Sequence, residues 1–393
     1  MTRYLDYSAT TPVDPRVLEA MLPYFTEHFG NANSLYAIGR DAFTTLEEAR
    51  TSIAGNIGAK APSEFVFTSG GTESDNMALI GSMNRLAPDG GGHIVTSAYE
   101  HHAILEPAHW LEKQGHEVTL VKPGADGHIH AEDVAAAIKP NTKLVSIIHA
   151  NNEVGAINDI KAISEVAHAA GAVMHTDAVQ SLGKIPFDVE DLGIDLASFS
   201  AHKIYGPKGI GGLYIRRGTK LDPFIKGGGQ EQRRRSGTQN VAGAVGFAKA
   251  LELMIAEQET EMPRLVALRD SVIEQVLARL ENTITSLDSG DRLPNIAPLI
   301  VKGVEGESML LQLDNLGFSI STGSACSSGS LEPSHVLLAI GIPQVIAHGS
   351  LRVSLGRYTT QQDIDDFVEA LVPIVERLRA MSPVYTRMFC SGK

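Results

Sequence analysis

The sequence predicts an α/β protein whose large domain contains a mostly parallel sheet and whose smaller C-terminal domain is α+β. Between residues 64 and 215, short apolar runs alternate with helical stretches, a pattern typical of a parallel sheet with helices on both faces. Polar motifs directly follow several of these runs, and ligands of such sheets bind beyond the carboxyl ends of the strands. After Gly227-Gly228-Gly229 the alternation gives way to long helical stretches. We therefore expect a large domain at 15–255 and a small domain at 256–393, to which the N-terminal arm, 1–14, also belongs.

The first sixty residues predict an extended arm and two helices. The run from Tyr4 to Pro12 is rich in small polar residues and ends at a proline, which is typical of an extended arm. A helix from about Pro15 to His28 follows. After a loop at 30–34, a second helix covers roughly Arg40 to Ile57, where apolar residues recur at helical spacing.

The alternating part predicts seven strands, each a short run of apolar residues. They cover residues 64–68, 93–97, 117–121, 144–148, 173–175, 196–199 and 213–215. Helices are expected between several of them, for example at about 104–114 and 160–170. The last part of the chain predicts helices at about 241–257, 265–280 and 361–380, and strands at 284–287 and 296–301.

The composition is that of an ordinary globular protein with an acidic balance. The chain contains 43% hydrophobic and 20% charged residues, and its 33 basic and 46 acidic residues give a formal net charge of -13. Such a charge disfavours non-specific binding to nucleic acids and to anionic membranes. The N-terminus lacks the apolar run of a signal peptide, and no stretch has the length and apolarity of a membrane span. Two cysteines, Cys326 and Cys390, are too few for a disulfide framework and suit a reducing compartment, so we expect a cytoplasmic protein that binds neither nucleic acid nor membrane.

Lys203 is the first candidate for a chemical role. It follows the apolar run 196–199 within Ser200-Ala201-His202-Lys203, and a glycine- and proline-rich turn comes after it. Glycines allow the backbone to approach a bound group closely. A lysine that is desolvated or next to a cation becomes a nucleophilic amine. This setting favours a Schiff-base lysine over a solvated surface lysine, and pyridoxal 5'-phosphate (PLP) is the usual carbonyl partner.

A phosphate site is a second candidate. The strand at 64–68 runs into Ser69-Gly70-Gly71-Thr72, where a helix begins. Helix N-termini bind anions through their unpaired N–H groups and the helix dipole. Gly71 and Thr72 would then contact a phosphate, although Gly-Gly-Thr alone better fits an ordinary capped helix start.

Further polar candidates follow other strands. Asp177 comes directly after the run 172–176, where a carboxylate could pair with a protonated pyridine nitrogen or simply cap a helix. Gln180 could reach the ring hydroxyl of PLP, and His101 could stack on the ring or move protons. Each residue alone fits a structural role. Their occurrence at successive strand ends, together with Lys203, favours one shared PLP site.

These segments together resemble NifS/IscS-type cysteine desulfurases, which belong to the class V aminotransferase group of PLP enzymes. The resemblance runs from Tyr4-Leu5-Asp6 to the segment 351–357, which is nearly the whole chain. Its most specific parts are Ser200-Ala201-His202-Lys203 and the segments 175–180 and 323–328. The resemblance implies the PLP-dependent transferase fold type I, with a seven-stranded sheet in the large domain, and a homodimer.

The resemblance also implies a role for each site residue. Lys203 would hold the cofactor, Asp177 would pair with its pyridine nitrogen, and Gln180 would pair with its ring oxygen. His101 would stack on the ring and move protons, and Asn152 would contact cofactor and substrate. The phosphate would be bound by Gly71, Thr72, Ser200 and His202, and by Thr238 of the partner subunit. The planar guanidinium of Arg352 would bind the substrate carboxylate.

Cys326 determines the reaction that the resemblance implies. It lies in a run of small polar residues, 321–330, which predicts a mobile loop with an accessible thiol. The thiolate is the reactive form of cysteine. L-Cysteine would be converted to L-alanine, and the persulfide left on Cys326 would pass to a sulfur-acceptor protein such as an iron–sulfur scaffold, or serve tRNA thiolation. No resident metal is expected, and a transient iron–sulfur ligand at Cys326 stays open.

Other interpretations stay open at this stage. The same residues would serve a selenocysteine lyase, whereas another class V aminotransferase would need no cysteine in the loop, so Cys326 argues against it. A catalytically silent scaffold is disfavoured because Lys203, Asp177, His101 and Cys326 occur together. The triplet Arg233-Arg234-Arg235 is either a solvated face with one structural arginine or a docking site for an acidic acceptor.

Overall fold

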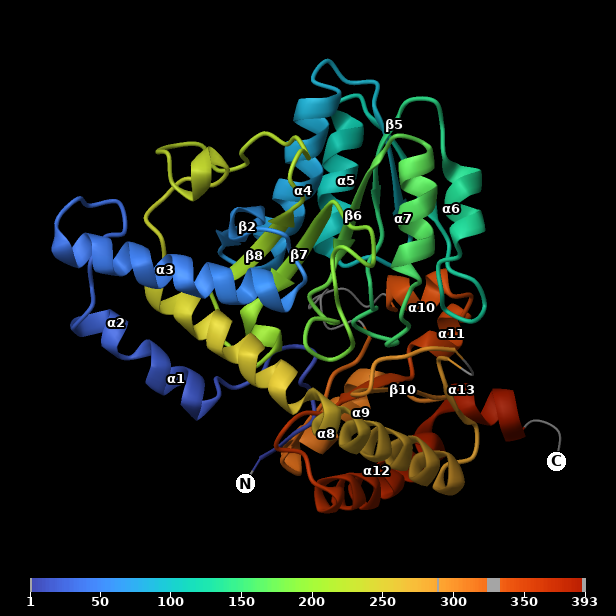
Figure 1. Cartoon of the computed structure of the whole chain (residues 1–393). Helices are drawn as coiled ribbons and strands as arrows, with labels where there is room; N and C mark the ends of the chain where they lie inside the picture. The colour runs from blue at the N-terminus through green and yellow to red at the C-terminus, as the bar shows by residue number, and fades with distance from the viewer. Residues whose placement is uncertain (1, 288–289, 324–332, 391–393) are drawn as a thin grey trace.

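A seven-stranded sheet forms the centre of the large part of the molecule. A computed structural model describes residues 2–287, 290–323 and 333–390, and in it the sheet has the strand order β2-β8-β7-β6-β5-β3-β4 (Figure 1). The strands are β2 (Phe65–Thr68), β3 (His93–Ser97), β4 (Glu117–Val121), β5 (Thr142–Ser146), β6 (Val173–Asp177), β7 (Leu196–Ser200) and β8 (Gly211–Ile215). All neighbouring pairs are parallel except the two that involve β8. The prediction of a mostly parallel, seven-stranded sheet is therefore confirmed.

Helices cover both faces of this sheet because its strands are apolar on both sides. Successive strand residues point to opposite faces. Accordingly, Val66 belongs to an apolar cluster with residues of α4 and α5, while Phe65 and Phe67 belong to a second cluster with residues of α3, α7 and α8. The helices of this part are α3 (Ala37–Asn56), α4 (Gly71–Leu86), α5 (His102–Lys113), α6 (Ala131–Ala137), α7 (Ile160–Ala169) and α8 (Val241–Arg279).

Two helix predictions are wrong, and a proline is involved in each. The helix expected at 15–28 is divided into α1 (Pro15–Met21) and α2 (Pro23–Thr26), because Pro23 has no N–H to continue the first helix. The two helices expected at 241–257 and 265–280 are one 39-residue helix, α8, with Pro263 inside it. This helix packs against α1 and α3 in its first half and against α12 (Gln361–Met381) further on, so packing outweighs the lost backbone hydrogen bond.

The remainder of the chain packs around a smaller antiparallel sheet, β12-β10-β9. Its strands are β9 (Thr283–Thr285), β10 (Ile296–Val301) and β12 (Ser350–Ser354), and its helices are α9 (Gly306–Asn315), α10 (His335–Ala339), α11 (Gln344–Ala347), α12 (Gln361–Met381) and α13 (Pro383–Tyr385). In the N-terminal arm, β1 (Arg3–Tyr4) pairs with β11 (Phe318–Ser319). Among the described residues, no helix is both long and apolar enough to cross a membrane.

We retain the division into two domains as a proposal. A separate apolar cluster contains Leu5 of the arm together with residues between Leu265 and Val375, which supports grouping the arm with the C-terminal part. The proposed boundary at 255/256 falls inside α8, so the two parts share one continuous helix.

Candidate active site

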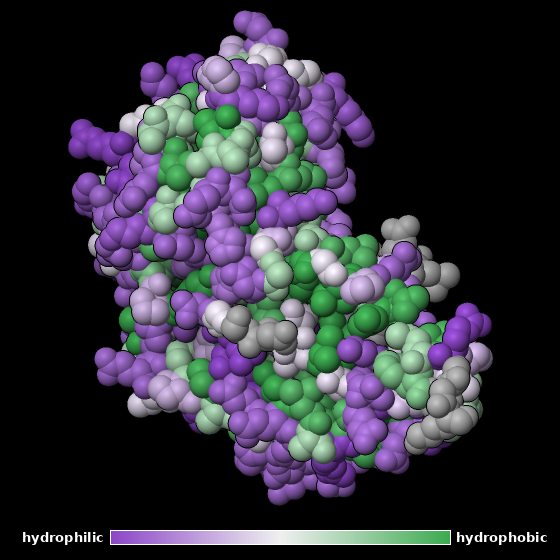
Figure 2. Space-filling model, turned by 90° about the vertical axis from the view of Figure 1, so that its right-hand side faces the viewer, coloured by the Kyte–Doolittle hydropathy of each residue, from purple (hydrophilic) through white to green (hydrophobic). Residues whose placement is uncertain are grey.

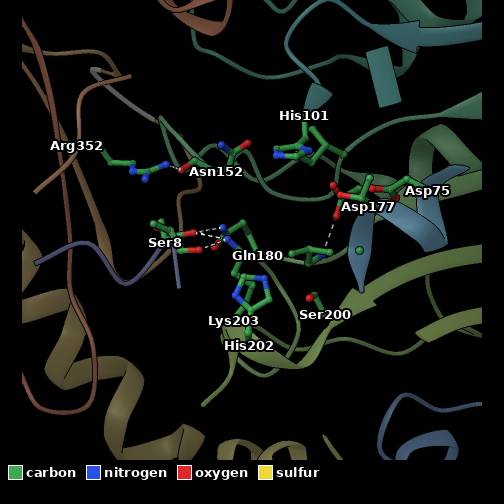
Figure 3. A pocket seen from close by; sticks show the side chains of 15 residues that line it. Ser8, Asp75, His101, Asn152, Asp177, Gln180, Ser200, His202, Lys203 and Arg352 are labelled. Carbon is green, nitrogen blue, oxygen red and sulfur yellow. Dashed lines mark hydrogen bonds between the residues drawn. The ribbon is translucent and has the colours of Figure 1, made fainter. Parts of the chain in front are cut away.

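A cavity of about 330 Å³ lies at the carboxyl ends of the parallel strands (Figure 3). Strand β6 ends at Asp177, β7 ends at Ser200, and a short 3-10 turn, Ala201–Lys203, follows β7. Because parallel strands end at the same edge of a sheet, polar residues that are far apart in the sequence surround one space. The cavity is lined by Ser8, Ala9, Gly71, Thr72, Asp75, His101, Ile148, Asn152, Asp177, Val179, Gln180, Ser200, His202, Lys203 and Arg352.

Lys203 contacts the N-terminal arm. Its Nζ donates hydrogen bonds to the carbonyl oxygens of Ser8 (2.6 Å) and Ala9 (2.8 Å). The arm is fixed to this segment, since the backbone N–H and the hydroxyl of Thr11 both donate to the carbonyl oxygen of His202. Ser8 and Ala9 also line the cavity and were not predicted from the sequence. They contribute backbone oxygens here, and a contact through backbone atoms cannot be predicted from a pattern of side chains.

Two buried carboxyl groups, Asp177 and Asp75, lie near each other in the cavity wall (Figure 3). Asp177 accepts a hydrogen bond from the backbone N–H of Val179 (2.8 Å). Burial raises the pKa of Asp177 to about 6, against the opposing effect of the Lys203 charge. Burial and the charge of Asp177 raise the pKa of Asp75 well above its usual range. Two negative charges are therefore disfavoured here, and a ligand that brings a positive charge would stabilise Asp177 as a carboxylate.

Asp75 is a further cavity residue that was not predicted from the sequence. Its Oδ1 is buried and has no hydrogen-bond partner among the described residues. The residue lies four positions after Gly71 on α4, hence on the same helix face, and that spacing was the available signal. Next to it, His175 is bound by the hydroxyls of Ser146 and Ser198, and burial lowers the pKa of His175 to about 3, so this ring is neutral.

One end of the cavity is suited to an anion. Helix α4 begins at Gly71, and the first N–H groups of a helix have no partner within it. A Cβ atom at Gly71 would approach Cγ2 of Val179 to 2.8 Å, so a larger residue here would require the Val179 side chain to shift. His202 contacts the Thr10 hydroxyl through Nδ1 (3.0 Å), and burial and the Lys203 charge lower the pKa of His202 to about 4. His202 is therefore a neutral hydrogen-bonding group near neutral pH.

His101 is also neutral. It caps the N-terminus of α5, because its Nδ1 accepts a hydrogen bond from the backbone N–H of Ala103 (3.0 Å). Burial, and then the charge of Lys203, lower the pKa of His101 to about 4. With Nδ1 acting as an acceptor, the ring hydrogen lies on Nε2.

Arg352 comes to the cavity from β12 of the small sheet. Its Nη1 donates to the carbonyl oxygen of Asn152 (3.0 Å), and its Nη2 donates to Oδ1 of Asp6 (2.9 Å). Its Nε is buried and has no hydrogen-bond partner among the described residues. A buried donor without a partner is costly, so a ligand oxygen would complete this arginine.

One predicted site residue, Thr238, does not line this cavity. Thr238 lines a separate cavity of about 120 Å³, together with Glu231 and Arg235. Cys326 lies outside the described residues. In the arginine triplet, Arg235 forms an ion pair with Glu73 (2.8 Å) and Arg234 donates to the carbonyl oxygen of Ser63 (2.8 Å).

The residues present fit PLP, the cofactor that the sequence predicts. The start of α4 and the hydroxyl of Ser200 suit a phosphate, and the buried pair of carboxyl groups suits a protonated pyridine nitrogen. Lys203 brings a primary amine into the same space, and the donor left on Arg352 suits the carboxylate of an amino acid.

Comparisons with known proteins agree with this fit. The family described as Aminotransferase class-V matches residues 3–367. The chain is 51% identical to "Cysteine desulfurase IscS" of Dictyoglomus turgidum, over 97% of this chain and 96% of the relative, and 49% identical to the IscS of Methanosarcina thermophila, over 97% and 94%. Among solved structures, a "NifS-like protein" superposes with a TM-score of 0.90 at 36% identity, covering 96% of this chain and 100% of that one. A structure titled "SspA in complex with cysteine" superposes with a TM-score of 0.80 at 37% identity, covering 91% of this chain and 100% of that one. With a family match over nearly its whole length, this chain belongs to the class-V aminotransferase family.

Proposed function

We propose that this protein is a cysteine desulfurase that uses PLP to convert L-cysteine to L-alanine and a persulfide on Cys326. Cysteine desulfurases of the class-V aminotransferase family use PLP. The observation that carries the proposal is the cavity itself. An amine (Lys203), a buried carboxyl pair and an arginine whose buried Nε has no partner among the described residues surround one space. That set matches the functional groups of PLP and of an amino acid.

Each side chain would have a defined task in that cavity. When bound, PLP supplies an electron sink that allows bonds near the α-carbon of an amino acid to break. Lys203 would hold the cofactor and then move protons, while Asp177 would accept a hydrogen bond from the pyridine nitrogen. The neutral ring of His101 would stack on the cofactor and donate through Nε2. Arg352 would bind the substrate carboxylate, with Asn152 beside it.

The group transfer would occur at Cys326. Its thiolate attacks the sulfur of the substrate, the carbon–sulfur bond breaks, and the electron pair of that bond remains with the carbon. A proton then completes the methyl group of alanine. The products are L-alanine and a Cys326 persulfide, so atoms and electrons balance without an external oxidant.

The test is a turnover assay on the purified protein. We expect PLP to give the protein a visible absorption band, and L-cysteine with a reductant to yield one alanine for each sulfide. A band without alanine would contradict the desulfurase proposal, and selenocysteine and amino-group acceptors would then be the substrates to try. With an iron–sulfur scaffold protein added, labelled sulfur should appear on the scaffold. Retention of all the sulfur on the enzyme would contradict that choice of acceptor.

The surface near the small sheet supports an acceptor protein as partner. Figure 2 shows hydrophobic residues gathered on the lower part of the face toward which α10, α11 and α13 are turned. Leu338, Val345 and Val384 on these helices are exposed. Exposed apolar patches mark protein interaction sites, and we place the docking of the sulfur acceptor here.

We also place the protein in the cytoplasm, where a persulfide-forming thiol stays reduced.

A homodimer is the assembly we propose. The segment from α1 through α2 to the start of α3, at the left edge of Figure 1, carries many exposed apolar side chains. They are Leu18, Leu22, Phe25, Phe29, Leu35, Tyr36, Ile38 and Phe43. Leu35 is 90% exposed, which a second subunit would correct by covering it. Thr238 lies outside the main cavity of its own subunit, which supports a role at the phosphate of the partner.

The shared site predicts that two inactive variants restore each other. We expect Lys203→Ala to inactivate the cavity of its own subunit, and Thr238→Asp to repel the phosphate in the cavity of the partner. In a mixed dimer, one cavity carries both defects and the other carries neither. Co-expressed variants should therefore regain about a quarter of wild-type turnover, since statistical mixing makes about half of the dimers mixed and closed symmetry gives each dimer two sites.

Separately purified homodimers of the two variants are the control, and both should be inactive. Light scattering should give the mass of a dimer for each variant. If Thr238→Asp inactivated its own subunit, mixed dimers would keep no intact cavity and activity would not return. That outcome would contradict the assignment of Thr238 to the partner.

A further inference from the structure

Lys184 is a buried lysine with no role in the reaction proposed above. It ends the turn that follows β6, and only 6% of the residue is exposed. Its Nζ donates to the backbone oxygen of Gln180 (3.0 Å) and to the side-chain Oε1 of Gln180 (3.1 Å). No ion pair joins Lys184 to a carboxylate among the residues that the structure describes. Burial of an amine without a carboxylate partner is unfavourable, so stability alone does not explain a lysine here.

The contact determines which way the amide of Gln180 faces. The amine of Lys184 donates its hydrogen bonds, so the atom of the Gln180 side-chain amide that faces it must be an acceptor, which is the oxygen Oε1. The amide nitrogen, Nε2, therefore lies on the other side, where it donates to the carbonyl oxygen of Ser8 (2.9 Å, Figure 3). The same Ser8 oxygen accepts from Nζ of Lys203 (2.6 Å). A continuous set of hydrogen bonds thus joins Lys184, Gln180, Ser8 and Lys203.

We propose that Lys184 is a positioning residue for the cofactor, which fixes the amide of Gln180 so that its nitrogen donates toward the ring oxygen of the bound PLP. The inference rests on the proposed roles of Lys203 and Gln180 and names the group that orients one of them. Without Lys184 the two ends of the amide are nearly equal in shape, and Gln180 could turn its oxygen toward the ring oxygen instead. Two acceptors would then face each other.

The groups around Lys184 indicate that it acts mainly through its hydrogen bonds to Gln180. Lys184 lines a small cavity together with Tyr7, Thr11, Lys203, Tyr205, Met254, Glu261, Met262, Leu265, Asn295, Leu355 and Arg357. The charged members other than Lys203 are already paired, Glu261 with Arg264, and Arg357 with Asp14 and Glu257. Burial raises the pKa of Tyr7 to about 12 and also raises that of Tyr205. The charge of Lys184 also reaches His202, whose pKa is low for the reasons given above. Burial, and then the charge of Lys203, lower the pKa of Lys184 to about 7. A neutral amine still has two hydrogens for the two oxygens of Gln180.

The test follows the pH-dependent absorption of the lysine-bound cofactor. A donor on the ring oxygen stabilises negative charge there. Without that donor, the negative charge on the ring oxygen of the cofactor is less stable, so the nearby proton is held more tightly. The midpoint of the absorption change then moves to higher pH. We expect Lys184→Met to raise the midpoint by about one pH unit, the scale of one hydrogen bond to a charged group. Gln180→Leu should raise it similarly, and the double variant should shift it by clearly less than the sum, because both changes remove one contact.

The matched control is Lys161→Met, which removes an exposed lysine of α7 that pairs with Asp191 and should leave the midpoint unchanged. If Lys184→Met does not fold, Lys184→Gln replaces it, since glutamine is polar but one bond too short to reach both oxygens, and it should shift the midpoint in the same direction. An unchanged midpoint in the Lys184 variant, or additive shifts in the double variant, would overturn the inference. A wild-type protein without any PLP band would instead overturn the proposed function.

Discussion

Replacing Cys326 with serine is expected to reduce alanine release to background while PLP binding is unchanged. A hydroxyl group does not take up the sulfur of the substrate, so the step that frees alanine has no acceptor. Removal of a covalent nucleophile costs on the order of 10⁶-fold in turnover in well-studied enzymes. Alanine release from L-cysteine and the mass of the protein after a single turnover would measure the effect, since the wild type should gain one sulfur atom on Cys326.

Cys390→Ser is the matched control, because Cys390 is the only other cysteine of the sequence. It lies at the end of the chain, and no cavity residue is near it in sequence. We expect the Cys390 variant to release alanine and to carry the persulfide like the wild type. Alanine release by the Cys326 variant at the wild-type rate would mean that sulfur leaves without this thiol. Loss of activity in the Cys390 variant alone would show that the persulfide forms on Cys390 and not on Cys326.

Most of the residues that meet in the site could be predicted from the sequence, because the topology of the sheet determines where its strands end. Asp177 and Ser200 end neighbouring parallel strands, and His101 and Asn152 lie in loops beyond β3 and β5. Parallel strands that alternate with helices end at one edge, so recognising the alternation already implied that these residues meet. Lys203 needed no more than its place after β7.

The parts that the sequence did not reveal depend on contacts between distant segments. Ser8 and Ala9 meet Lys203 through backbone oxygens, which carry no residue-specific signal. Lys184 resembles an ordinary lysine in a turn until its burial is known. The continuous α8 could not be inferred across Pro263, because the packing that stabilises it comes from α3 and α12. Local patterns therefore predict elements and strand ends, whereas burial and long-range pairing require the folded chain.

Replacing Lys203 with alanine is expected to remove the absorption band of lysine-bound PLP and to lower turnover by about 10²–10⁴-fold, the usual contribution of a positioned proton-transfer group. The amine lies in the same cavity as Asp177, and two carbonyl oxygens of the arm position it, so no other described group replaces it there. Absorbance of the purified variant with added PLP, and alanine release, would measure both effects. Lys220→Ala, which removes an exposed lysine that does not line the cavity, should retain the absorption band and the turnover.

The outcome that would contradict this assignment is a lysine-bound band that survives in the Lys203 variant. Lys184 would be the first alternative, since it is buried and, like Lys203, lines the neighbouring cavity. Its Nζ, however, donates to both oxygens of Gln180, and it does not line the main cavity. To reach the cofactor it would have to give up both hydrogen bonds and leave the Gln180 oxygens without a donor, which is unfavourable in a buried site. If Lys184 binds the cofactor in place of Lys203, the double variant Lys203→Ala, Lys184→Met should lose the band that the single variant keeps. A band that also survives in the double variant would have another origin.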